Sequence, residues 1–271
     1  AGTDNGLYVY HNDTTPLQHI IHDSRNIQSL TNNIIWNIFA DQEHSIWLGT
    51  DYGISLSRYN SALQFIPISQ ITGTGDGNQF YSLFRDSKGF YWFGGANGLI
   101  RFTDPAGERH DAIWYRMGDK TYPLSHNRIR HIYEDKEQQL WIATDGSINR
   151  YDYATRQFIH YNIVDNTGTY NTNWTYYIFE DTAGQLWIST CLGGIFVVDK
   201  RKLMQSTSGQ YIAEQNYSVH NGLSGMFINQ IIPDNEGNVW VLLYNNKGID
   251  KINPRTREVT KLFADELTGE K

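Results

Sequence analysis

The chain has 271 residues, of which 39% are hydrophobic and 14% aromatic, so it can bury a substantial core. Its 29 acidic and 22 basic residues give a net charge of -7, and no Lys/Arg cluster follows a groove, which excludes the usual signature of nucleic-acid binding. One cysteine, Cys191, cannot form an internal disulfide, and this leaves the cytoplasm and a bacterial periplasm equally open.

A short motif recurs five times, with a tryptophan six residues after an aspartate, in DQEHSIW, DSKGFYW, DKEQQLW, DTAGQLW and DNEGNVW. The tryptophans, at intervals of 45, 49, 46 and 53 residues, are Trp47, Trp92, Trp141, Trp187 and Trp240. A period of about 40 to 50 residues with a polar turn and an aromatic anchor is typical of a four-stranded propeller blade. The sequence therefore predicts an all-β fold, a β-propeller of four-stranded antiparallel blades.

In chain order, the repeats predict a partial N-terminal blade followed by five complete blades in a single domain, residues 1–271. The first residues, GTDNGLYVY, match GTDYGISLSRY after Trp47, so residues 2–22 should supply only the third and fourth strands of a blade. Such an unclosed arc leaves apolar blade faces at both ends, so we expect it to associate end to end as a homodimer or, alternatively, to lose its terminal strands and contract around five or six blades. The blade units are expected at about residues 1–30 (partial), 31–70, 76–116, 124–162, 171–215 and 223–264.

The unit at residues 124–162 shows best how one repeat makes one blade. Asn127–Asp135 is rich in β-branched and aromatic residues and predicts the inner strand, and Lys136–Gln139 make a polar turn. LWIAT is the second strand, Asp145 and Gly146 break it, SINRY is the third, and Arg156–Tyr161 is the outer fourth.

Each repeated aspartate suits the start of a turn, because its carboxylate can accept hydrogen bonds from backbone amides just ahead of it. Three glycines occur at the five positions three residues later, which predicts a positive φ at His44, Gly89, Gln138, Gly184 and Gly237. We expect the tryptophans to pack between neighbouring blades. The apolar pairs before each aspartate should also be core: Ile35/Ile38, Phe80/Leu83, Ile129/Ile132, Thr175/Ile178 and Ile228/Ile231.

The string LSHNRIRHIYEDKEQQLWIATDGSINRYD resembles the two-component regulator propeller repeat, and SLTNNIIWNIFADQEHSIWLGTDYGI, YNTNWTYYIFEDTAGQLWISTCLGGI and GLSGMFINQIIPDNEGNVWVLLYNNKGI follow the same pattern. Met226 departs from it, since other repeats place an asparagine at that position. The resemblance implies a fragment of a seven-bladed propeller from the periplasmic sensor region of Bacteroides-type hybrid two-component regulators. It also implies an oligosaccharide ligand, a histidine kinase in the parent chain, and contact with the inner membrane only through parts of the parent outside this sequence.

In a propeller, the loops that lead into the inner strands and the loops between second and third strands open on one face. Aromatic rings, amides and carboxylates on that face suit a sugar, whose ring has an apolar side and whose hydroxyls need partners. The ligand-binding residues predicted on this basis are Asn33, Asp51, Tyr52, Gln79, Arg128, Asp145, Trp174 and Tyr244. For the asparagine and the two aspartates, a purely structural role in a turn is the alternative, and for Arg128 it is an ion pair with a neighbouring blade.

No catalytic residue set, cofactor site or metal site is expected. The closely spaced pair His19 and His22 would point to opposite faces of a strand, which makes a poor metal site. Two other functions stay open at this point: a propeller enzyme acting on glycans, as a lyase or a glycosidase, and a protein-binding scaffold. Paired carboxylates such as Asp51 and Asp145 would be needed for a glycosidase, and their separation cannot be read from sequence.

Overall fold

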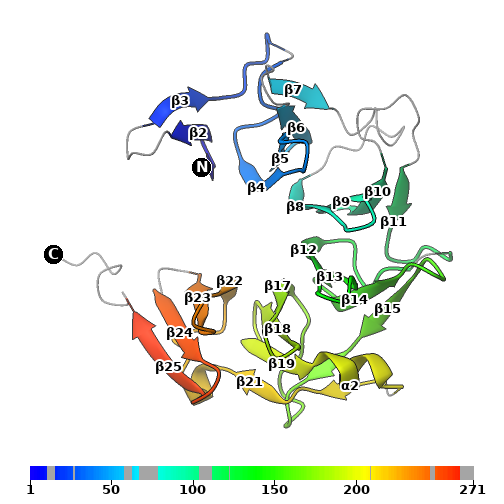
Figure 1. Cartoon of the computed structure of the whole chain (residues 1–271), viewed down its shortest axis with the longest axis vertical. Coiled ribbons are helices and arrows are strands. Elements are labelled where there is room, and N and C mark those ends of the chain that lie inside the picture. Colours follow the sequence, from blue (N-terminus) through cyan, green and yellow to red (C-terminus); the bar gives the residue numbers. More distant parts are fainter. Residues whose placement is uncertain are drawn as a thin grey trace. The chain divides into compact units, whose positions relative to one another are not determined.

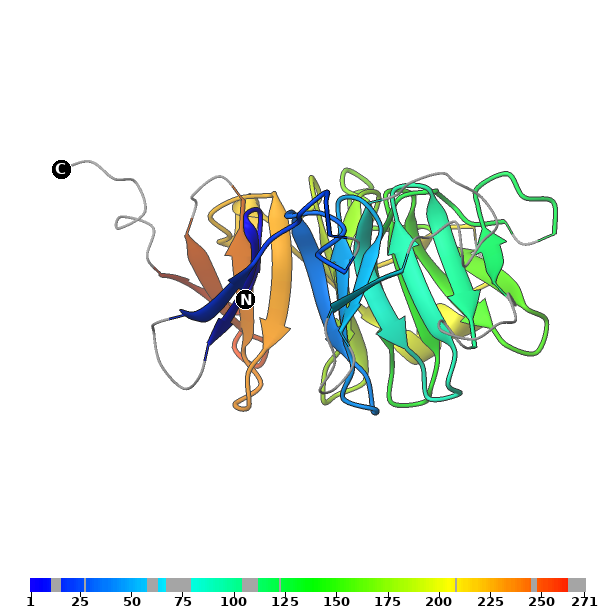
Figure 2. The same ribbon diagram turned by 90° about the horizontal axis from the view of Figure 1, so that it is seen from above.

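The computed structural model describes residues 1–10, 16–26, 28–57, 63–66, 79–103, 112–121, 123–207, 209–244 and 248–262. The chain divides into two compact units, one made of residues 1–120 with 127–132, the other of residues 121–126 with 133–271. Figure 1 shows that almost every element in both is a β-strand. The strands of each sheet run up and down between turns at its two ends (Figure 2).

The first unit contains a three-stranded sheet and two four-stranded antiparallel sheets. The three-stranded sheet is formed by β1 (Gly2–Thr3), β2 (Gly6–Tyr10) and β3 (Pro16–Ile20). The next is formed by β4 (Ile35–Ala40), β5 (Ile46–Thr50), β6 (Ile54–Ser57) and β7 (Leu63–Ile66). The third is formed by β8 (Phe80–Arg85), β9 (Tyr91–Gly95), β10 (Gly98–Phe102) and β11 (Ile113–Tyr115).

Strand β12 (Ile129–Glu134) crosses from the first unit into the second and opens the next sheet. That sheet continues with β13 (Leu140–Thr144), β14 (Ser147–Asp152) and β15 (Gln157–Tyr161). The following sheet has the order β17 (Thr175–Glu180), β18 (Gln185–Thr190), β19 (Ile195–Asp199) and β21 (Gln215–Tyr217). The last has β22 (Ile228–Pro233), β23 (Val239–Leu243), β24 (Ile249–Asn253) and β25 (Glu258–Leu262).

The second unit also carries elements outside the four-stranded sheets. These are helix α2 (Lys200–Gln205), a parallel strand pair of β16 (Ile163–Val164) with β20 (Tyr211–Ile212), and the 3₁₀ turn η1 (Val219–Asn221). No helix in the described part of the chain is long and apolar enough to cross a membrane.

Five four-stranded antiparallel sheets and one partial N-terminal sheet confirm the predicted propeller of five complete blades and a fragment. The prediction that the N-terminal fragment has only two strands is wrong. Gly2 and Thr3 form the short strand β1, which pairs with Leu7 and Gly6 of β2. Gly6, at φ +98°, turns the chain back, so these two residues pair as a third strand of the sheet.

The repeated aspartate closes its own turn and also holds the tryptophan that follows it. Oδ1 of Asp135 accepts hydrogen bonds from the backbone N–H groups of Glu137 and Gln139, and Oδ2 accepts one from the Trp141 indole, all at 2.9 Å. The same aspartate-to-indole bond, 2.7 to 2.9 Å long, joins Asp41 to Trp47, Asp86 to Trp92, Asp181 to Trp187 and Asp234 to Trp240. The six-residue spacing thus places one carboxylate between a turn and a ring.

Hydrogen bonds also perturb one of these carboxylates. The Asn238 side chain is the largest cause, and although partial burial acts in the opposite direction, the Trp240 indole and nearby backbone amides add to the effect. Together they lower the pKa of Asp234 to about 2, so this carboxylate stays ionised at any neutral or mildly acidic pH.

The positive φ predicted three residues after each aspartate is confirmed at all five positions. Glycine occupies three of them without strain, whereas His44 and Gln138 hold φ values of 62° and 60° despite their side chains. In each turn the N–H of this residue donates to the carbonyl of the aspartate, as Gln138 does to Asp135 at 2.9 Å.

The core lies between neighbouring sheets of each unit. Trp47, Trp92, Trp141 and Trp187 are at most 2% exposed, and Trp141 packs against residues of the next sheet such as Ile178 and Ile188. Trp240 is only half-buried, under the Lys251 ammonium. The expected apolar pairs are buried with one exception.

The exception is Ile38, which is 44% exposed, so its assignment to the core is wrong. The partial N-terminal sheet places only the short strand β1 beside β4, where Gly2 lies against Ile35 and Ile38 without a side chain of its own. In complete sheets a glycine also faces this pair, Gly49 against Phe80 and Leu83 and Gly94 against Ile129 and Ile132, and both pairs are buried, so the exposure of Ile38 goes with the short length of β1.

Candidate ligand-binding site

Four inner strands carry a bulge that presents one side chain in each. The register of β4, β8, β17 and β22 shifts by one residue between Ile35 and Asn37 and at the equivalent places in the other three strands. A bulge leaves its extra residue outside the ladder and re-aims its side chain. The bulged residues are Trp36, Tyr81, Tyr176 and Asn229, and Arg130 holds the same repeat position on β12.

In the first unit, bulged residues and two of the predicted site residues form a connected group. Oδ1 of Asp51 accepts hydrogen bonds from the Trp36 indole at 3.1 Å and from the Gln79 amide at 2.8 Å. The Tyr81 hydroxyl donates to Oε1 of Gln79 at 2.5 Å. The Trp36 and Tyr81 rings meet edge to face with centroids 5.4 Å apart, and the Arg130 guanidinium lies 5.6 Å from the centre of the Tyr81 ring. We call these five residues the Asp51 cluster.

The Asp51 cluster combines a fixed polar network with an accessible aromatic ring. Trp36 is 50% exposed, and the other four side chains are half-buried. Within the described part of the chain, the second carboxylate oxygen of Asp51 accepts no hydrogen bond from protein. That oxygen can accept from a ligand hydroxyl while the Trp36 ring offers an apolar face beside it.

Three other predicted site residues of the first unit lie outside the Asp51 cluster. Oδ1 of Asn33 accepts from the His22 N–H at 2.7 Å, so the repeated asparagine ties its blade to the preceding one. Tyr52 is 61% exposed and borders a cavity of about 350 Å³ near His22. Arg128 is exposed on the segment that leads into β12.

The second unit holds the remaining three predicted residues. The Trp174 N–H donates to the Asp145 carbonyl at 3.0 Å, which joins the loops of two adjacent blades. Trp174 is 48% exposed and has a φ of 55°, a strained conformation that this contact helps to hold. Tyr244 is 41% exposed and meets the bulged Tyr176 edge to face, with ring centroids 5.9 Å apart.

Sequence reasoning missed the bulged residues because regular strand alternation gives no reason to single them out. A signal was present: an aromatic residue stands three positions after the repeated asparagine in Trp36, Tyr81 and Tyr176. Among the described residues, no group of three or more His, Cys, Asp or Glu side chains is arranged to hold a metal ion.

Comparison with known proteins agrees with the repeat pattern. The model of the two-component regulator propeller family matches residues 29–52, 74–97 and 123–146. The extracellular domain of a hybrid two-component system from B. thetaiotaomicron matches with 99% identity and a TM-score of 0.75, over 99% of this chain and 36% of that one. A second such domain from the same organism matches with 21% identity and a TM-score of 0.74, over 96% of this chain and 32% of that one.

A virginiamycin B lyase from Staphylococcus aureus also matches, with 14% identity and a TM-score of 0.57 over 84% of this chain and 69% of that one, a likeness of fold alone. A search of curated proteins found no match. The fold and these matches define a β-propeller sensor domain that lies outside the cytoplasm, in the periplasm. Three segments of the chain thus match the two-component regulator propeller family, and the chain spans about a third of the solved chains it resembles.

Proposed function

We propose that this sensor domain binds an oligosaccharide at the Asp51 cluster, without catalysis, and that binding is signalled to a histidine kinase in the parent protein. The observation that carries the proposal is the half-exposed Trp36 ring, held by a carboxylate that keeps one oxygen for a ligand. Sugars are recognised by such a pairing of an apolar ring face with oriented polar groups.

The network also explains how the cluster would be pre-organised. Tyr81 orients Gln79, Gln79 and Trp36 orient Asp51, and each of these bonds exists before a ligand arrives. A site that needs no rearrangement loses less conformational entropy on binding. The cluster contains one cationic side chain, Arg130 beside Tyr81, and one anionic side chain, Asp51, so we expect it to favour neutral or weakly acidic sugars.

A role in catalysis is less well supported. Oδ1 of Asp51 accepts hydrogen bonds that hold two side chains in place, and Asp145 belongs to the other unit of the chain. Hydrolysis of a glycosidic bond commonly needs two carboxyl groups at a set separation. The lyase that shares the fold does so at 14% identity, which carries no catalytic residues across.

The first prediction tests the cluster directly. Trp36→Ala should weaken oligosaccharide binding by about 1 to 3 kcal/mol, the scale known for stacking on aromatic side chains, and Asp51→Ala should weaken it further by removing the carboxylate oxygen offered to the ligand. Calorimetric titration against an oligosaccharide panel measures both changes. Tyr10→Ala is the matched control, an exposed aromatic of the same unit outside the cluster, and should bind normally.

Two outcomes would reject the proposal. If Trp36→Ala and Tyr10→Ala bind alike, the cluster is not the site. If glycans incubated with the protein release new reducing ends or unsaturated products at a rate abolished in Asp51→Asn, the domain is an enzyme. Signalling is tested in the parent protein, where ligand should change kinase autophosphorylation and Trp36→Ala should remove that response.

A further inference from the structure

The blade built on β17 differs from the others by additions to its outer half. Between β19 and β21 the chain forms helix α2 and strand β20, and the interval from Trp187 to Trp240, 53 residues, exceeds the other three. Strand β20 pairs in parallel with β16, with Ile163 opposite Tyr211, and so connects two neighbouring blades of the second unit. A blade needs none of these elements for its own pairing.

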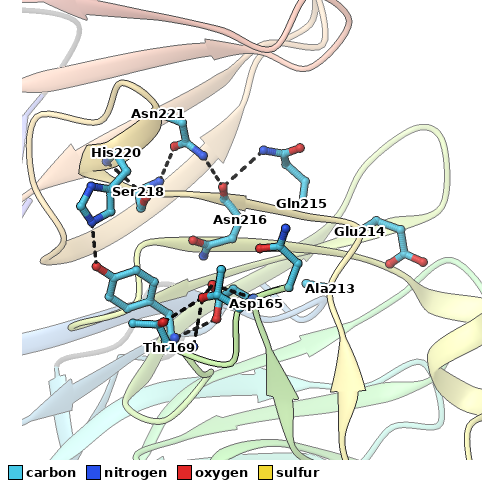
Figure 3. A pocket seen from close by; sticks show the side chains of 12 residues that line it. Asp165, Thr169, Ala213, Glu214, Gln215, Asn216, Ser218, His220 and Asn221 are labelled. Atoms are coloured by element: carbon cyan, nitrogen blue, oxygen red, sulfur yellow. Dashed lines mark hydrogen bonds between the residues drawn. The ribbon is translucent and has the colours of Figure 1, made fainter.

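The segments that follow β16 and β20 line a cavity of about 500 Å³ (Figure 3). One wall is the turn at residues 165–170 that follows β16, and the opposite wall is the segment 213–221 that includes β21 and η1. Figure 3 shows Ser218, His220 and Asn221 facing Asp165 and Thr169 across the space. The volume is that of a small-ligand site.

Both walls are held rigid by internal hydrogen bonds. Asp165 accepts from the Thr167 hydroxyl at 2.5 Å and from the Tyr170 N–H at 2.8 Å. Across the cavity, Oδ1 of Asn221 accepts from the Ser218 N–H at 2.6 Å. The Asn221 amide donates to the strand β21 carbonyl of residue 216, also at 2.6 Å, which fixes η1 against the edge of the sheet.

The two carboxylates of the cavity are already engaged by protein groups. Burial acts to raise the pKa of Asp165, but hydrogen bonds from Thr167 and Tyr170 outweigh it and lower that pKa, so the group is a buried, satisfied anion. Glu214 accepts from the Tyr211 hydroxyl at 2.9 Å and from the Asp199 N–H at 2.8 Å. No lysine or arginine is among the described lining residues, which leaves nothing to attract an anionic ligand.

The lining also contains the polar side chains of Asn166, Thr169, Gln215 and Asn216, of which the Gln215 and Asn216 amides also donate to backbone carbonyls. Tyr170 and His220 add two rings, whose hydroxyl and Nε2 lie 3.2 Å apart and whose planes are tilted by 35°. Amides and hydroxyls beside an aromatic surface match a ligand with many hydroxyls and no charge.

We propose that this cavity is a second binding site, separate from the Asp51 cluster, for a neutral polyhydroxylated ligand of mono- or disaccharide size. Tyr170 and His220 contact the apolar side of the sugar ring, and the amides bind its hydroxyls. The acidic groups in the walls disfavour acidic sugars by like-charge repulsion. The proposal does not rest on the proposed function, because the two sites share no residue.

The test is a titration of the whole chain with three neutral disaccharides, maltose, cellobiose and galactobiose, and with digalacturonate as an acidic probe. Calorimetry measures binding, and NMR of the His220 imidazole reports where it occurs. Neutral sugars should shift the His220 signals, assigned with His220→Gln, and digalacturonate should not. Tyr170→Phe, which keeps the ring but removes the hydroxyl, should weaken this binding by about 3- to 10-fold. Thr169→Trp should abolish it by filling the space, whereas Thr260→Trp, at an exposed strand position, should not.

The two sites are distinguished by crossed variants. Binding at the cavity should persist in Trp36→Ala and be lost in Thr169→Trp. Neutral sugar binding that is lost in Trp36→Ala but unchanged in Thr169→Trp would overturn the second site and leave the first. His220 signals unmoved by every sugar, in a protein whose melting temperature is normal, would also overturn it.

Discussion

At the scale of single residues, one carboxylate per repeat performs two tasks. The aspartate accepts backbone N–H groups of its turn through one oxygen and the tryptophan indole through the other, as Asp135 does for Trp141. A buried indole N–H without a partner would cost about 1 to 3 kcal/mol. The hydrogen bond from the aspartate therefore allows tryptophan, the largest side chain, to be buried in the core. The turn then requires a positive φ three residues on.

The second prediction concerns that φ. Gln138→Gly should stabilise the protein by about 1 kcal/mol, because a side chain in the left-handed region costs roughly 1 to 2 kcal/mol and glycine avoids much of this cost. Gly237→Ala should destabilise it by a similar amount, since a Cβ at that position meets no atom within 4 Å and only the backbone is affected. Urea unfolding measures both.

Gly209→Ala is the control for these variants. A Cβ there also meets open space, but Gly209 has no positive φ. Its substitution should therefore leave the free energy of unfolding unchanged or slightly raised. Equal losses for Gly209→Ala and Gly237→Ala would show that backbone strain is not the cause.

At the scale of the element, the bulge near the start of four inner strands places one side chain outside the ladder, where it can contact a ligand, while the rest of the strand keeps its pairing. In β4, Ile35 and Asn37 stay in the ladder with Thr50 and Gly49, while Trp36 between them is left out of the pairing. The strand thus keeps its hydrogen bonds and its core contacts, and the bulged side chain can differ from blade to blade. In the four bulged strands it is tryptophan, tyrosine, tyrosine and asparagine.

The third prediction follows from this separation. Tyr81→Phe should lower oligosaccharide affinity by about 3- to 10-fold, because Gln79 loses the hydroxyl that orients it, and should change the melting temperature little. Calorimetry and thermal unfolding measure the two effects. Tyr10→Phe serves as the control. A loss of stability that matches the loss of affinity would place Tyr81 in the folding core instead.

At the scale of the whole molecule, a buried ion cluster joins neighbouring blades of the second unit. The Lys200 ammonium, 3% exposed, lies 3.0 Å from Asp135 and 2.7 Å from Glu180, and it also contacts Glu137. Asp135 and Glu137 come from one blade, whereas Glu180 and Lys200 come from the next. Lys200, Asp135 and Glu180 are buried, so losing the Lys200 cation would leave buried carboxylates unpaired on both blades, and the ion pairs therefore link the two blades.

The fourth prediction tests this link. Lys200→Met should cost about 3 to 5 kcal/mol of unfolding free energy, because it leaves two buried carboxylates without their cation. Lys202→Met, two residues along the same helix and 66% exposed, should cost less than about 1 kcal/mol. Denaturant unfolding of both variants gives the comparison, and equal effects would mean that the cluster adds nothing to stability.

Much of the fold could be predicted from the sequence because its signals are local. The aspartate, the turn and the tryptophan lie within seven residues, and their recurrence predicts the blades, the positive φ values and the buried Trp141. The strand LWIAT was predicted with its observed bounds, Leu140–Thr144. Of the candidate site, the sequence pointed to Asp51 and Gln79 but gave no sign that they bond to each other.

The rest depended on residues far apart in the chain. Asp51 and Gln79 are 28 positions apart, and they meet because neighbouring blades pack and a bulge turns Trp36 toward them. The exposure of Ile38 and the polar cavity between the segments 165–170 and 213–221 likewise depend on which segments cover a blade. By itself the sequence determined the repeating unit, because turn and strand preferences act within a few residues. Only the tertiary structure decided which polar side chains share a site, because that choice is made by packing between blades.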